Sequence, residues 1–543
     1  MRVVVAGLMV AVAGKAAAVP AGFANTAGRI IAADAPANGP GVSAVVSENG
    51  RIVWKGASGR ADSAGAPLKA DSLFRYASIS KQFTAALILK LAEEGKLSLD
   101  DTLGKLLPGE TPPAWHPVTV RQLLNHTSGI PSYTGKPSFM AEASTARAIS
   151  TQGLIDVTRD DPLDFAPGTE FRYNNTGYVL LSAIAEKLTG KPWYAALRER
   201  ITGPLGLNSI RCGCEPGPAV VEGFGAEGRP AQRIDMSVPS GAGALVGSAA
   251  DLARWGAALH GGKVLKPASY QAMITPIPPK GVSMAYGFGL TRGEVRGVPT
   301  IGHNGGIFGF NTESLYSPDK KIFVAVLANS DSREPGADTT ARRLLAAAAG
   351  VAFPELRAQP LDLKAAEPFF GVYRDARTER RFYAKDGKLF TQRTGADPLE
   401  VYAAGGGRYF YGPSSLTYFE VGRDGAGKPR LTFHPEGQVT GIEAAWTGAA
   451  SGPAAAAAVV PVAQLDLLAG EYATGPAVMT IARNGEKLTG QLTGQSPIGL
   501  EAIGPREFRT VGVDARLTFV EEGGRIVRVV LNQNGRTIPF ERR

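Results

Sequence analysis

The stretch "FRYASISKQF" (residues 74–83) places Ser78 three residues before Lys81, immediately ahead of an apolar helical run. This spacing has two interpretations: a nucleophile beside its base, or an ordinary helix cap followed by a solvated lysine. A chain of this length should contain about one S-x-x-K by chance, and a second copy, "SPDK", runs from Ser317 to Lys320. The surrounding sequence must therefore distinguish the two copies.

The position of Ser78 at the start of a helix suits a nucleophile. Free backbone N–H groups and the dipole at a helix N-terminus favour the negative charge that develops during acyl transfer. Lys81 lies one turn later on the same face and can reach Ser78, and burial would lower its pKa so that it can accept a proton. Ser317 lacks this context, because Pro318 and a tight turn follow it.

Two more motifs follow in chain order. "YNN" (173–175) directly precedes an apolar-periodic helix and is the only Y-x-N in the chain. "HNGG" (303–306) lies in a β-rich, glycine-rich stretch. A second H-x-G starts at His260, but it closes a predicted helix and is typical of a C-terminal stop.

Secondary-structure signals around these motifs predict one mixed α/β unit over residues 26–352. Strand pairs occur at both of its ends and helices between them. The predicted hairpins lie at 41–57 and around the "PDK" turn at 318–320, and the predicted helices at 83–94, 119–125, 176–189, 249–260 and 336–350. "LFRYA" is predicted to be a strand that ends at Ser78.

In this order, S-x-x-K, Y-x-N and H-x-G resemble the motifs of the serine β-lactamase and penicillin-binding-protein superfamily, specifically its class C-like branch. Longer stretches carry the same resemblance, among them "TVRQLLNHTSGIPSY", "FAPGTEFRYNNTGYVLLSAIAEKLTGKPW", "PLGLNSI" and "GALVGSAADLARWG". It covers nearly all of residues 38–350. The resemblance implies a β-lactamase/transpeptidase-like α/β (α+β) domain and a serine hydrolase that forms an acyl-enzyme, with no metal and no organic cofactor.

The resemblance also implies roles for individual residues. Ser78 is the expected nucleophile, Lys81 the lysine that keeps it poised, and Tyr173 the group that passes protons to the leaving group and activates water. A Lys81 cation is expected to lower the pKa of Tyr173 from about 10. The Gly306 and Ser78 N–H groups are expected to form the oxyanion hole. The expected site residues are, for catalysis, Ser78, Lys81, Tyr173 and His303 and, for substrate binding, Asn175, Gly305 and Gly306.

His303 is a departure from the family pattern, because other members carry a lysine at this place. A lysine is a fixed cation that can hold a substrate carboxylate, whereas histidine is mostly neutral at pH 7. Carboxylate recognition should therefore be weaker, which favours amidase, aminopeptidase or esterase activity. His126, in the recurrent "NHTSG" loop, is interpreted as structural.

The chain after residue 355 has a different sequence pattern, which predicts short alternating strands, glycine-rich turns and no helix. "FFGVY" (369–373) resembles "LAGEY" (468–472), and "KDGKLFTQ" (385–392) resembles "RNGEKLTGQ" (483–491), both with an offset of 99 residues. We expect two lipocalin-like antiparallel β-barrels at 356–448 and 464–543, joined by an Ala/Gly/Pro linker at 449–463. The alternative is one larger β domain with a flexible insert.

This three-domain organisation resembles that of D-aminopeptidases, in which a barrel loop can cap the active site. The matching loop here, "QLTGQSPIGL" (491–500), contains no carboxylate that could bind a substrate amine. The prediction is that the second barrel packs on the catalytic domain and that this loop narrows the entrance to Ser78.

The composition is that of a globular protein with a formal net charge of +9. Without a basic run or a basic-aromatic patch, nucleic acid is not an expected partner. Residues 1–21 resemble a secretory signal peptide, which predicts a periplasmic or secreted protein with no stable membrane insertion. The two cysteines, Cys212 and Cys214, could form a small disulfide in an oxidising compartment, and they make a weak metal site.

The resulting hypothesis is an exported serine hydrolase that acts on peptides, amides or esters, including D-amino-acid-containing and cell-wall-derived compounds. The enzymatic alternative is a carboxylesterase, or a weak β-lactamase or D-Ala-D-Ala carboxypeptidase, with the same site. The non-enzymatic alternative is an acylatable sensor or a peptidoglycan-binding protein. The oligomeric state is not specified by the sequence.

Overall fold

In the computed structural model the described residues are 19–543 without 377, 395, 413, 449–459, 475–476, 493–497, 511–514 and 534–535. Most of the predicted signal peptide and linker, and the centre of the 491–500 loop, lie outside these residues, so the predictions made for them remain predictions. The chain divides into two units, Met1–Pro354 and Glu355–Arg543.

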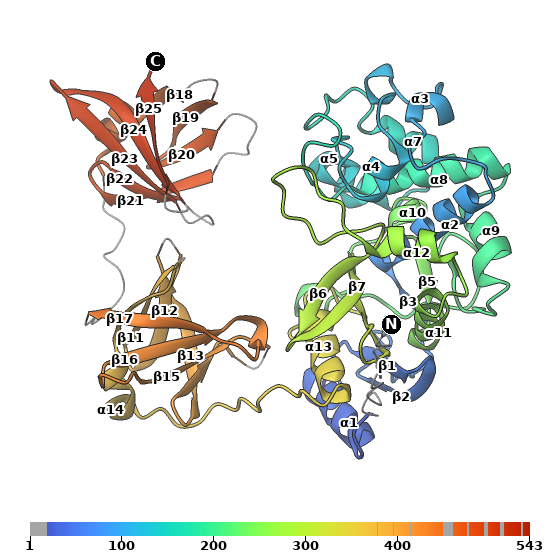
Figure 1. Ribbon diagram of the computed structural model, residues 1–543, viewed down its shortest axis with the longest axis horizontal. Helices are drawn as coiled ribbons and strands as arrows, with labels where there is room; N and C mark the ends of the chain where they lie inside the picture. The colour runs from blue at the N-terminus through green and yellow to red at the C-terminus, as the bar shows by residue number, and fades with distance from the viewer. Residues whose placement is uncertain are drawn as a thin grey trace, which may run out of the picture. The chain divides into compact units, whose positions relative to one another are not determined.

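The first unit is built on a six-stranded antiparallel sheet with the strand order β2-β1-β9-β8-β7-β6 (Figure 1). The two predicted hairpins, β1–β2 and β8–β9, come from opposite ends of the unit. They lie side by side in the sheet, because β1 pairs with β9. The strands are β1 (Val42–Glu48), β2 (Arg51–Ser58), β6 (Thr291–Val295), β7 (Val298–Ile307), β8 (Phe310–Ser317) and β9 (Ile322–Ala328).

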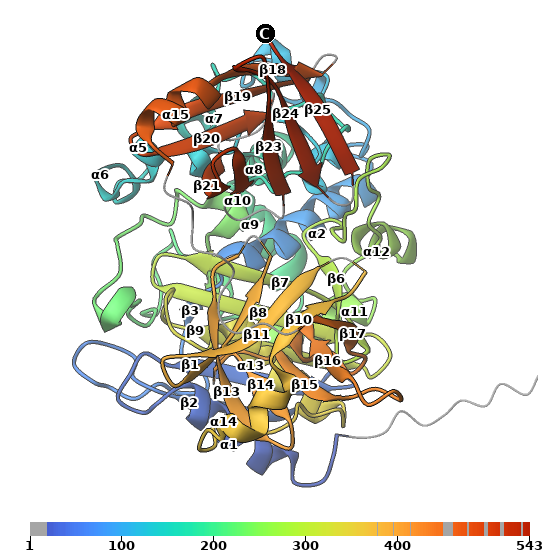
Figure 2. The ribbon, with the colours of Figure 1, turned by 90° about the vertical axis from the view of Figure 1, so that its left-hand side faces the viewer.

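Helices cover both faces of this sheet, which explains why "IFVAVLA" in β9 is buried at every position. Alternate β9 residues point to opposite sides: Val324 and Val326 pack with helices α1 (Phe23–Asp34) and α13 (Ala337–Ala348), whereas Ala325 and Leu327 join the larger core. Figure 2 shows the sheet and these helices from a second side.

The larger core is formed mainly by helices, and the S-x-x-K and Y-x-N motifs lie at the starts of two of them, α2 (Ser80–Glu93) and α8 (Asn175–Thr189). The other main helices are α4 (Val120–Leu124), α7 (Thr151–Asp156), α9 (Trp193–Leu197), α10 (Ser240–Gly243), α11 (Ala249–His260) and α12 (Pro267–Ile274). Helices α3 (Leu103–Leu106), α5 (Pro137–Met140) and α6 (Glu142–Thr145) are, like α10, four residues long. A small sheet joins β3 (Phe74–Arg75), β5 (Leu245–Gly247) and β4 (Arg211–Cys212).

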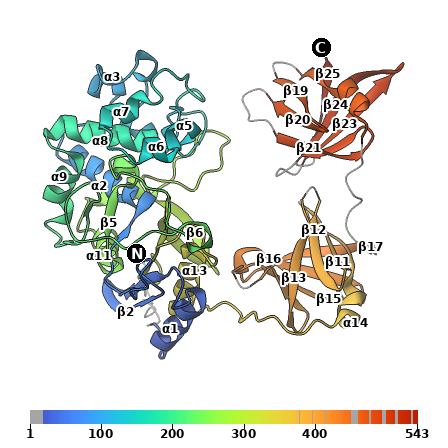
Figure 3. The same cartoon turned by 180° about the vertical axis from the view of Figure 1, so that it is seen from behind.

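The second unit consists of two closed eight-stranded antiparallel barrels, which confirms the predicted fold class (Figure 3). The first barrel contains β10 (Gly371–Arg374), β11 (Glu379–Lys385), β12 (Lys388–Arg393), β13 (Leu399–Gly405), β14 (Arg408–Phe410), β15 (Tyr418–Arg423), β16 (Pro429–His434) and β17 (Ile442–Gly448). The second contains β18 (Gly470–Thr474), β19 (Ala477–Asn484), β20 (Lys487–Leu492), β21 (Ile498–Gly504), β22 (Glu507–Thr510), β23 (Ala515–Glu522), β24 (Arg525–Gln533) and β25 (Arg536–Arg542).

The 99-residue repeat extends to individual contacts in the two barrels. The hydroxyl of Tyr373 donates to the carbonyl of Phe369 at 2.5 Å, and the equivalent Tyr472 hydroxyl donates to Leu468 at 2.7 Å. Apolar side chains from the strands of each barrel pack into a core cluster of its own, as expected for barrels of eight strands.

The prediction that no helix follows residue 355 is wrong. Helices α14 (Leu363–Ala366) and α15 (Val462–Leu468) each precede the first strand of a barrel, and their starts keep the 99-residue offset. Leu465 and Leu468 of α15 are buried in the core of the second barrel. The seven-residue length of α15 and its place in the Ala-rich segment gave no strong periodicity to detect.

Candidate active site

Ser78 lies in a tight turn between strand β3 and helix α2. The predicted strand ends at Arg75, and residues Ala77–Ile79 form a 3₁₀ turn that runs directly into α2. Ala77 is buried and has a φ of 49°, a left-handed conformation that costs a residue with a side chain about 1–3 kcal/mol. Such strain is typical of sites where the backbone must present one side chain in a fixed direction.

Lys81 is completely buried one turn beyond Ser78. Its Nζ lies 3.1 Å from Ser78 Oγ, 2.7 Å from Asn175 Oδ1 and 2.9 Å from the carbonyl oxygen of Ala242. Burial lowers the pKa of Lys81 well below its ordinary value, which favours the neutral amine. A neutral amine has two N–H donors for the two fixed acceptors, Asn175 and Ala242, so its lone pair is left for the Ser78 hydroxyl proton.

Helix α8 positions Asn175 at its first residue. The side chain of Asn174 caps this helix by accepting from the Gly177 N–H at 2.6 Å, and its Nδ2 donates to a loop carbonyl. Asn175 Nδ2 donates to Thr134 Oγ1 at 3.0 Å, so Asn175 is held with its oxygen toward Lys81. Asn175 therefore contacts Lys81 and also lines the cavity that opens at Ser78.

Tyr173 lies close to Ser78 and Lys81. Its pKa is raised, whereas the prediction was that a Lys81 cation would lower it. The Lys81 Nζ is 4.8 Å from the centre of the Tyr173 ring. Although 39% of Tyr173 is exposed, burial of its hydroxyl raises its pKa, and a hydrogen bond with Ser78 opposes this only in part. Tyr173 is therefore a phenol near neutral pH, and Lys81 is the better proton acceptor.

A cavity of about 380 Å³ opens at Ser78 and defines the space for a substrate. Most of its walls are apolar or uncharged. The lining residues are Ala77, Ser78, Tyr133, Thr134, Met140, Asn175, Ile234, Val238, Pro239, Ala242, Gly243, Gly306, Ile307, Phe308 and Asp331. None of these residues is Lys or Arg, so nothing in the described lining acts as a fixed cation for a substrate carboxylate.

The two glycines of "HNGG" have different positions. Gly305 faces inward, where an added Cβ would lie 2.5 Å from the Tyr76 carbonyl oxygen and 3.0 Å from the Ala77 Cβ. Its missing side chain lets strand β7 approach the turn that carries Ser78. Gly306 is exposed and lines the cavity. Only Gly306 therefore meets the substrate space, as the alternation of a strand requires.

His303, predicted to be a catalytic residue, is not among the residues that line the cavity. It is 2% exposed, on the inward face of β7. Its Nδ1 donates to the Asn304 carbonyl at 2.6 Å, so the unprotonated Nε2 of the neutral ring accepts from the Tyr286 hydroxyl at 2.8 Å. Burial lowers the pKa of His303 to about 3, which keeps it neutral. Its ring lies behind Tyr173, with 6.1 Å between the ring centres.

His126 supports the same region from the other side, in agreement with a structural role. It has a φ of 62°, is 1% exposed, and its Nδ1 accepts from the Asn174 N–H at 3.1 Å. Its ring lies 4.4 Å from that of Tyr173, centre to centre. His126 therefore fixes the start of helix α8 and the backbone that carries Tyr173.

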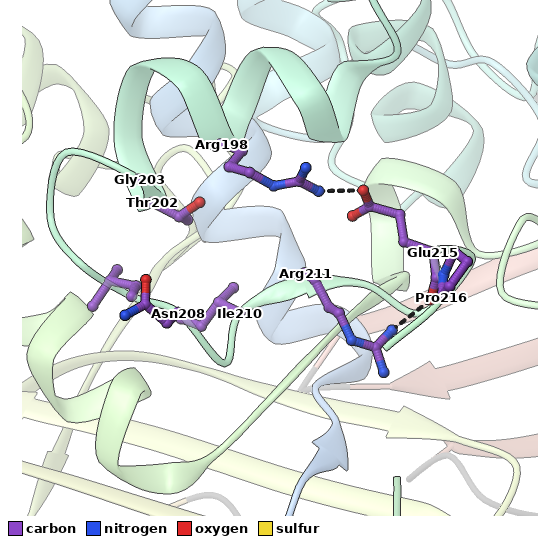
Figure 4. Close-up of a pocket in the computed structure, with 9 residues that line it drawn as sticks. Arg198, Thr202, Gly203, Asn208, Ile210, Arg211, Glu215 and Pro216 are labelled. Carbon is purple, nitrogen blue, oxygen red and sulfur yellow. Dashed lines mark hydrogen bonds and ion pairs between the residues drawn. The ribbon is translucent and has the colours of Figure 1, made fainter. Parts of the chain in front are cut away.

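A second cavity, of about 280 Å³, has Arg198, Arg211 and Glu215 in its lining (Figure 4). Arg198 forms an ion pair with Glu215, and Arg211 donates to the carbonyls of Glu215 and Pro218 at 2.8 and 2.7 Å. Cys212 and Cys214 form a disulfide next to it. Because both guanidinium groups already have partners, this cavity is a weaker candidate for a substrate-binding site than the cavity at Ser78.

Sequence reasoning missed three contributors to the site. The Ala242 carbonyl and Thr134 hydroxyl act through single hydrogen bonds on segments with no catalytic motif. Asp331 follows the buried strand β9 within three residues, and a carboxylate at a strand end is a signal that could have been noticed. Among the described residues, no group of three or more His, Cys, Asp or Glu is placed to hold a metal ion.

Comparison with known proteins gives consistent results. The Beta-lactamase family model matches residues 29–349. Penicillin-binding protein 4* of Bacillus subtilis is 28% identical over 403 residues, which covers 69% of this chain and 86% of that protein. A D-aminopeptidase of Cereibacter sphaeroides is 28% identical over 323 residues, which covers 58% of this chain and 61% of that protein.

A solved structure is similar to the catalytic unit. The D-stereospecific amidohydrolase from Streptomyces sp. is 29% identical, with a TM-score of 0.53, and the match covers 60% of this chain and 98% of that one. Within the part of the chain that is described, no helix has the length and apolar character needed to cross a bilayer.

Proposed function

Because the chain belongs to the Beta-lactamase family of serine hydrolases, we propose that it cleaves amide or ester bonds of small D-amino-acid-containing substrates through an acyl-enzyme on Ser78. The observation that carries this proposal is the 3.1 Å contact between Ser78 and a buried Lys81 at the mouth of a largely apolar cavity. The similarity to a D-aminopeptidase and a D-stereospecific amidohydrolase supports the choice of substrate.

The first half-reaction uses the two groups nearest to Ser78. Neutral Lys81 takes the hydroxyl proton as Ser78 Oγ forms a bond to the substrate carbonyl carbon, whose oxygen becomes an oxyanion facing the Ser78 and Gly306 N–H groups. When the C–N or C–O bond of the substrate breaks, the leaving group takes a proton from the Tyr173 hydroxyl. The Lys81 ammonium then returns a proton to Tyr173.

The second half-reaction repeats these transfers with water. Lys81 accepts a proton from the attacking water, directly or through Tyr173, and the new oxyanion collapses to release the acid. The proton returns to Ser78 Oγ and restores the starting state. Tyr173 begins and ends each half-reaction as a neutral phenol, which is the state that burial favours.

A panel of four substrates tests this function: a nitrophenyl ester, a chromogenic cephalosporin, a D-alanine anilide and an L-alanine anilide. The proposal predicts hydrolysis of the ester and of the D-anilide over the L-anilide. Turnover of the cephalosporin above the D-anilide would favour the β-lactamase alternative, and ester turnover alone the carboxylesterase alternative. A stable acyl-enzyme with no turnover would indicate a sensor or a peptidoglycan-binding protein.

We also propose that the protein works in the periplasm or outside the cell. The Cys212–Cys214 disulfide supports this location, because such bonds persist in oxidising compartments. Fractionation of expressing cells tests the location, and recovery of the full-length, unprocessed chain in the cytoplasm would contradict it.

A further inference from the structure

Asp331 is the one charged side chain among the described residues that line the cavity at Ser78. We propose that Asp331 is the specificity-determining residue that binds a protonated amine on the acyl part of the substrate. This inference rests on the proposed function. It moves amine recognition from the barrel loop at 491–500, which has no carboxylate, to the catalytic unit itself.

The carboxylate of Asp331 is held in place but only partly used. Its Oδ2 accepts from the Gly309 N–H at 2.7 Å, and the Asp331 N–H donates to the Phe224 carbonyl at 3.1 Å. The side chain is exposed to the cavity, and within the described part of the chain it has no ion pair with Lys or Arg. Oδ1 is therefore available to a cationic ligand.

The turn that supplies the Gly309 N–H requires glycine. Gly309 has a φ of 78°, and an added Cβ would lie 2.6 Å from the Cα of Gly223 and 2.7 Å from the Cβ of Ala231. These close approaches bring the amide to the carboxylate of Asp331. The backbone therefore fixes the orientation of the Asp331 carboxylate, whereas the carboxylate of a surface aspartate without such a hydrogen bond rotates freely.

The surroundings increase the effect of this single charge. The acyl group remains in the cavity, bonded to Ser78, after the leaving group departs, so the cavity lining contacts the acyl part. Ile234, Val238 and Phe308 line the same cavity, and once a substrate fills it their apolar surface reduces the screening of a carboxylate–ammonium pair. A charge-assisted hydrogen bond in such a place changes affinity by about 10- to 100-fold.

The test compares two anilides that differ only in the amine: D-alanine p-nitroanilide and propionic acid p-nitroanilide. Asp331→Asn keeps an oxygen for the Gly309 N–H and removes only the charge. We expect the ratio of kcat/KM for the aminoacyl over the propionyl compound to fall about 10- to 100-fold, and Asp331→Lys to lower it further. The matched control is Asp62→Asn, a loop carboxylate that also accepts a backbone N–H and lies outside the cavity lining. It should leave the ratio unchanged.

A binding measurement separates this inference from the proposed function. In a Ser78→Ala background, calorimetry should show that D-alaninamide binds about 10- to 100-fold more weakly after Asp331→Asn, and more weakly at high salt. Equal binding by both proteins, or an unchanged kcat/KM ratio, would overturn the role of Asp331. Full hydrolysis by Ser78→Ala would instead overturn the proposed mechanism and leave the binding result intact.

Discussion

Replacement of Lys81 by methionine removes the proposed base while it keeps most of the side-chain volume. Lys81 is fully buried and contacts Ser78, Asn175 and the Ala242 carbonyl. Loss of a positioned general base typically reduces the rate by about 10²- to 10⁴-fold. We therefore expect kcat/KM for a nitrophenyl ester to fall by that factor in Lys81→Met.

The same substitution should leave the protein folded. The Ala242 carbonyl is buried and loses a donor, at about 1–3 kcal/mol, whereas the half-buried Asn175 oxygen can turn to water at lower cost. Removal of the buried amine itself recovers a similar amount, about 1–3 kcal/mol. The free energy of unfolding should change by no more than about 3 kcal/mol, within the usual stability of a domain.

The pH dependence gives an independent signature of Lys81. Its pKa is lowered by burial, so wild-type kcat/KM should rise with pH through a value below 10.5, where the amine becomes neutral. In the same window the unfolded chain binds a proton that the folded chain does not, so stability should also rise with pH up to 10.5. Lys81→Met should lack both effects.

The assay combines ester hydrolysis over pH with denaturant unfolding at each pH. The matched control is Lys90→Met, a partly exposed lysine of the same helix that contacts the Val264 carbonyl rather than the site. A folded Lys81→Met protein with kcat/KM within about tenfold of wild type would refute its role as general base.

Three further predictions concern residues of strands β7 and β8. Burial raises the pKa of Glu313 to about 8 from 4.5, so between these pH values the folded state keeps a proton that the unfolded state has lost. The free energy of unfolding should therefore fall by up to about 1.4 kcal/mol per pH unit between pH 4.5 and pH 8. Denaturant unfolding should show that Glu313→Gln removes this pH dependence, and an unaltered pH dependence would contradict the shift. His303→Lys should lower the free energy of unfolding by about 1–3 kcal/mol, because it buries an amine. It should not change the ratio of activities on carboxylate-bearing and neutral esters, and a raised ratio would show that residue 303 faces the carboxylate of the substrate. Gly305→Ala should lower the melting temperature and kcat/KM, since its Cβ would lie 2.5 Å from a backbone oxygen. In Gly306→Ala the added Cβ meets nothing within 4 Å, so this variant should have the melting temperature of the wild type. Equal melting temperatures of the two variants would contradict the close packing at Gly305.

Much of the fold could be predicted from the sequence because its signals are local or repeated. Helix α11 has the predicted bounds, and the hairpin around Asn49 and Gly50 forms as the β-rich runs indicate. The 99-residue repeat predicted two barrels, since each copy must bury its own apolar face. Helix α15 was missed because seven residues carry too little periodicity.

The motifs also predicted which side chains gather around Ser78, but not which way each one faces. His303 and Gly306 are three residues apart on one strand and therefore lie on opposite faces, so only one of them lines the cavity. The direction of the Tyr173 pKa depends on how deeply its hydroxyl is buried, which no motif encodes. The Ala242 carbonyl is a backbone group, which every residue has, so the amino-acid sequence does not indicate its contact with Lys81.

The most direct measurement of the central claim is the mass of the intact protein after reaction with a small fluorophosphonate. Wild-type protein should gain one phosphonyl adduct, which peptide mapping should assign to Ser78, and Ser78→Ala should gain none. Ser317→Ala, which alters the other S-x-x-K serine, at the end of strand β8, should label like wild type. An adduct of equal yield on Ser78→Ala, or one mapped to any residue but Ser78, would contradict the account.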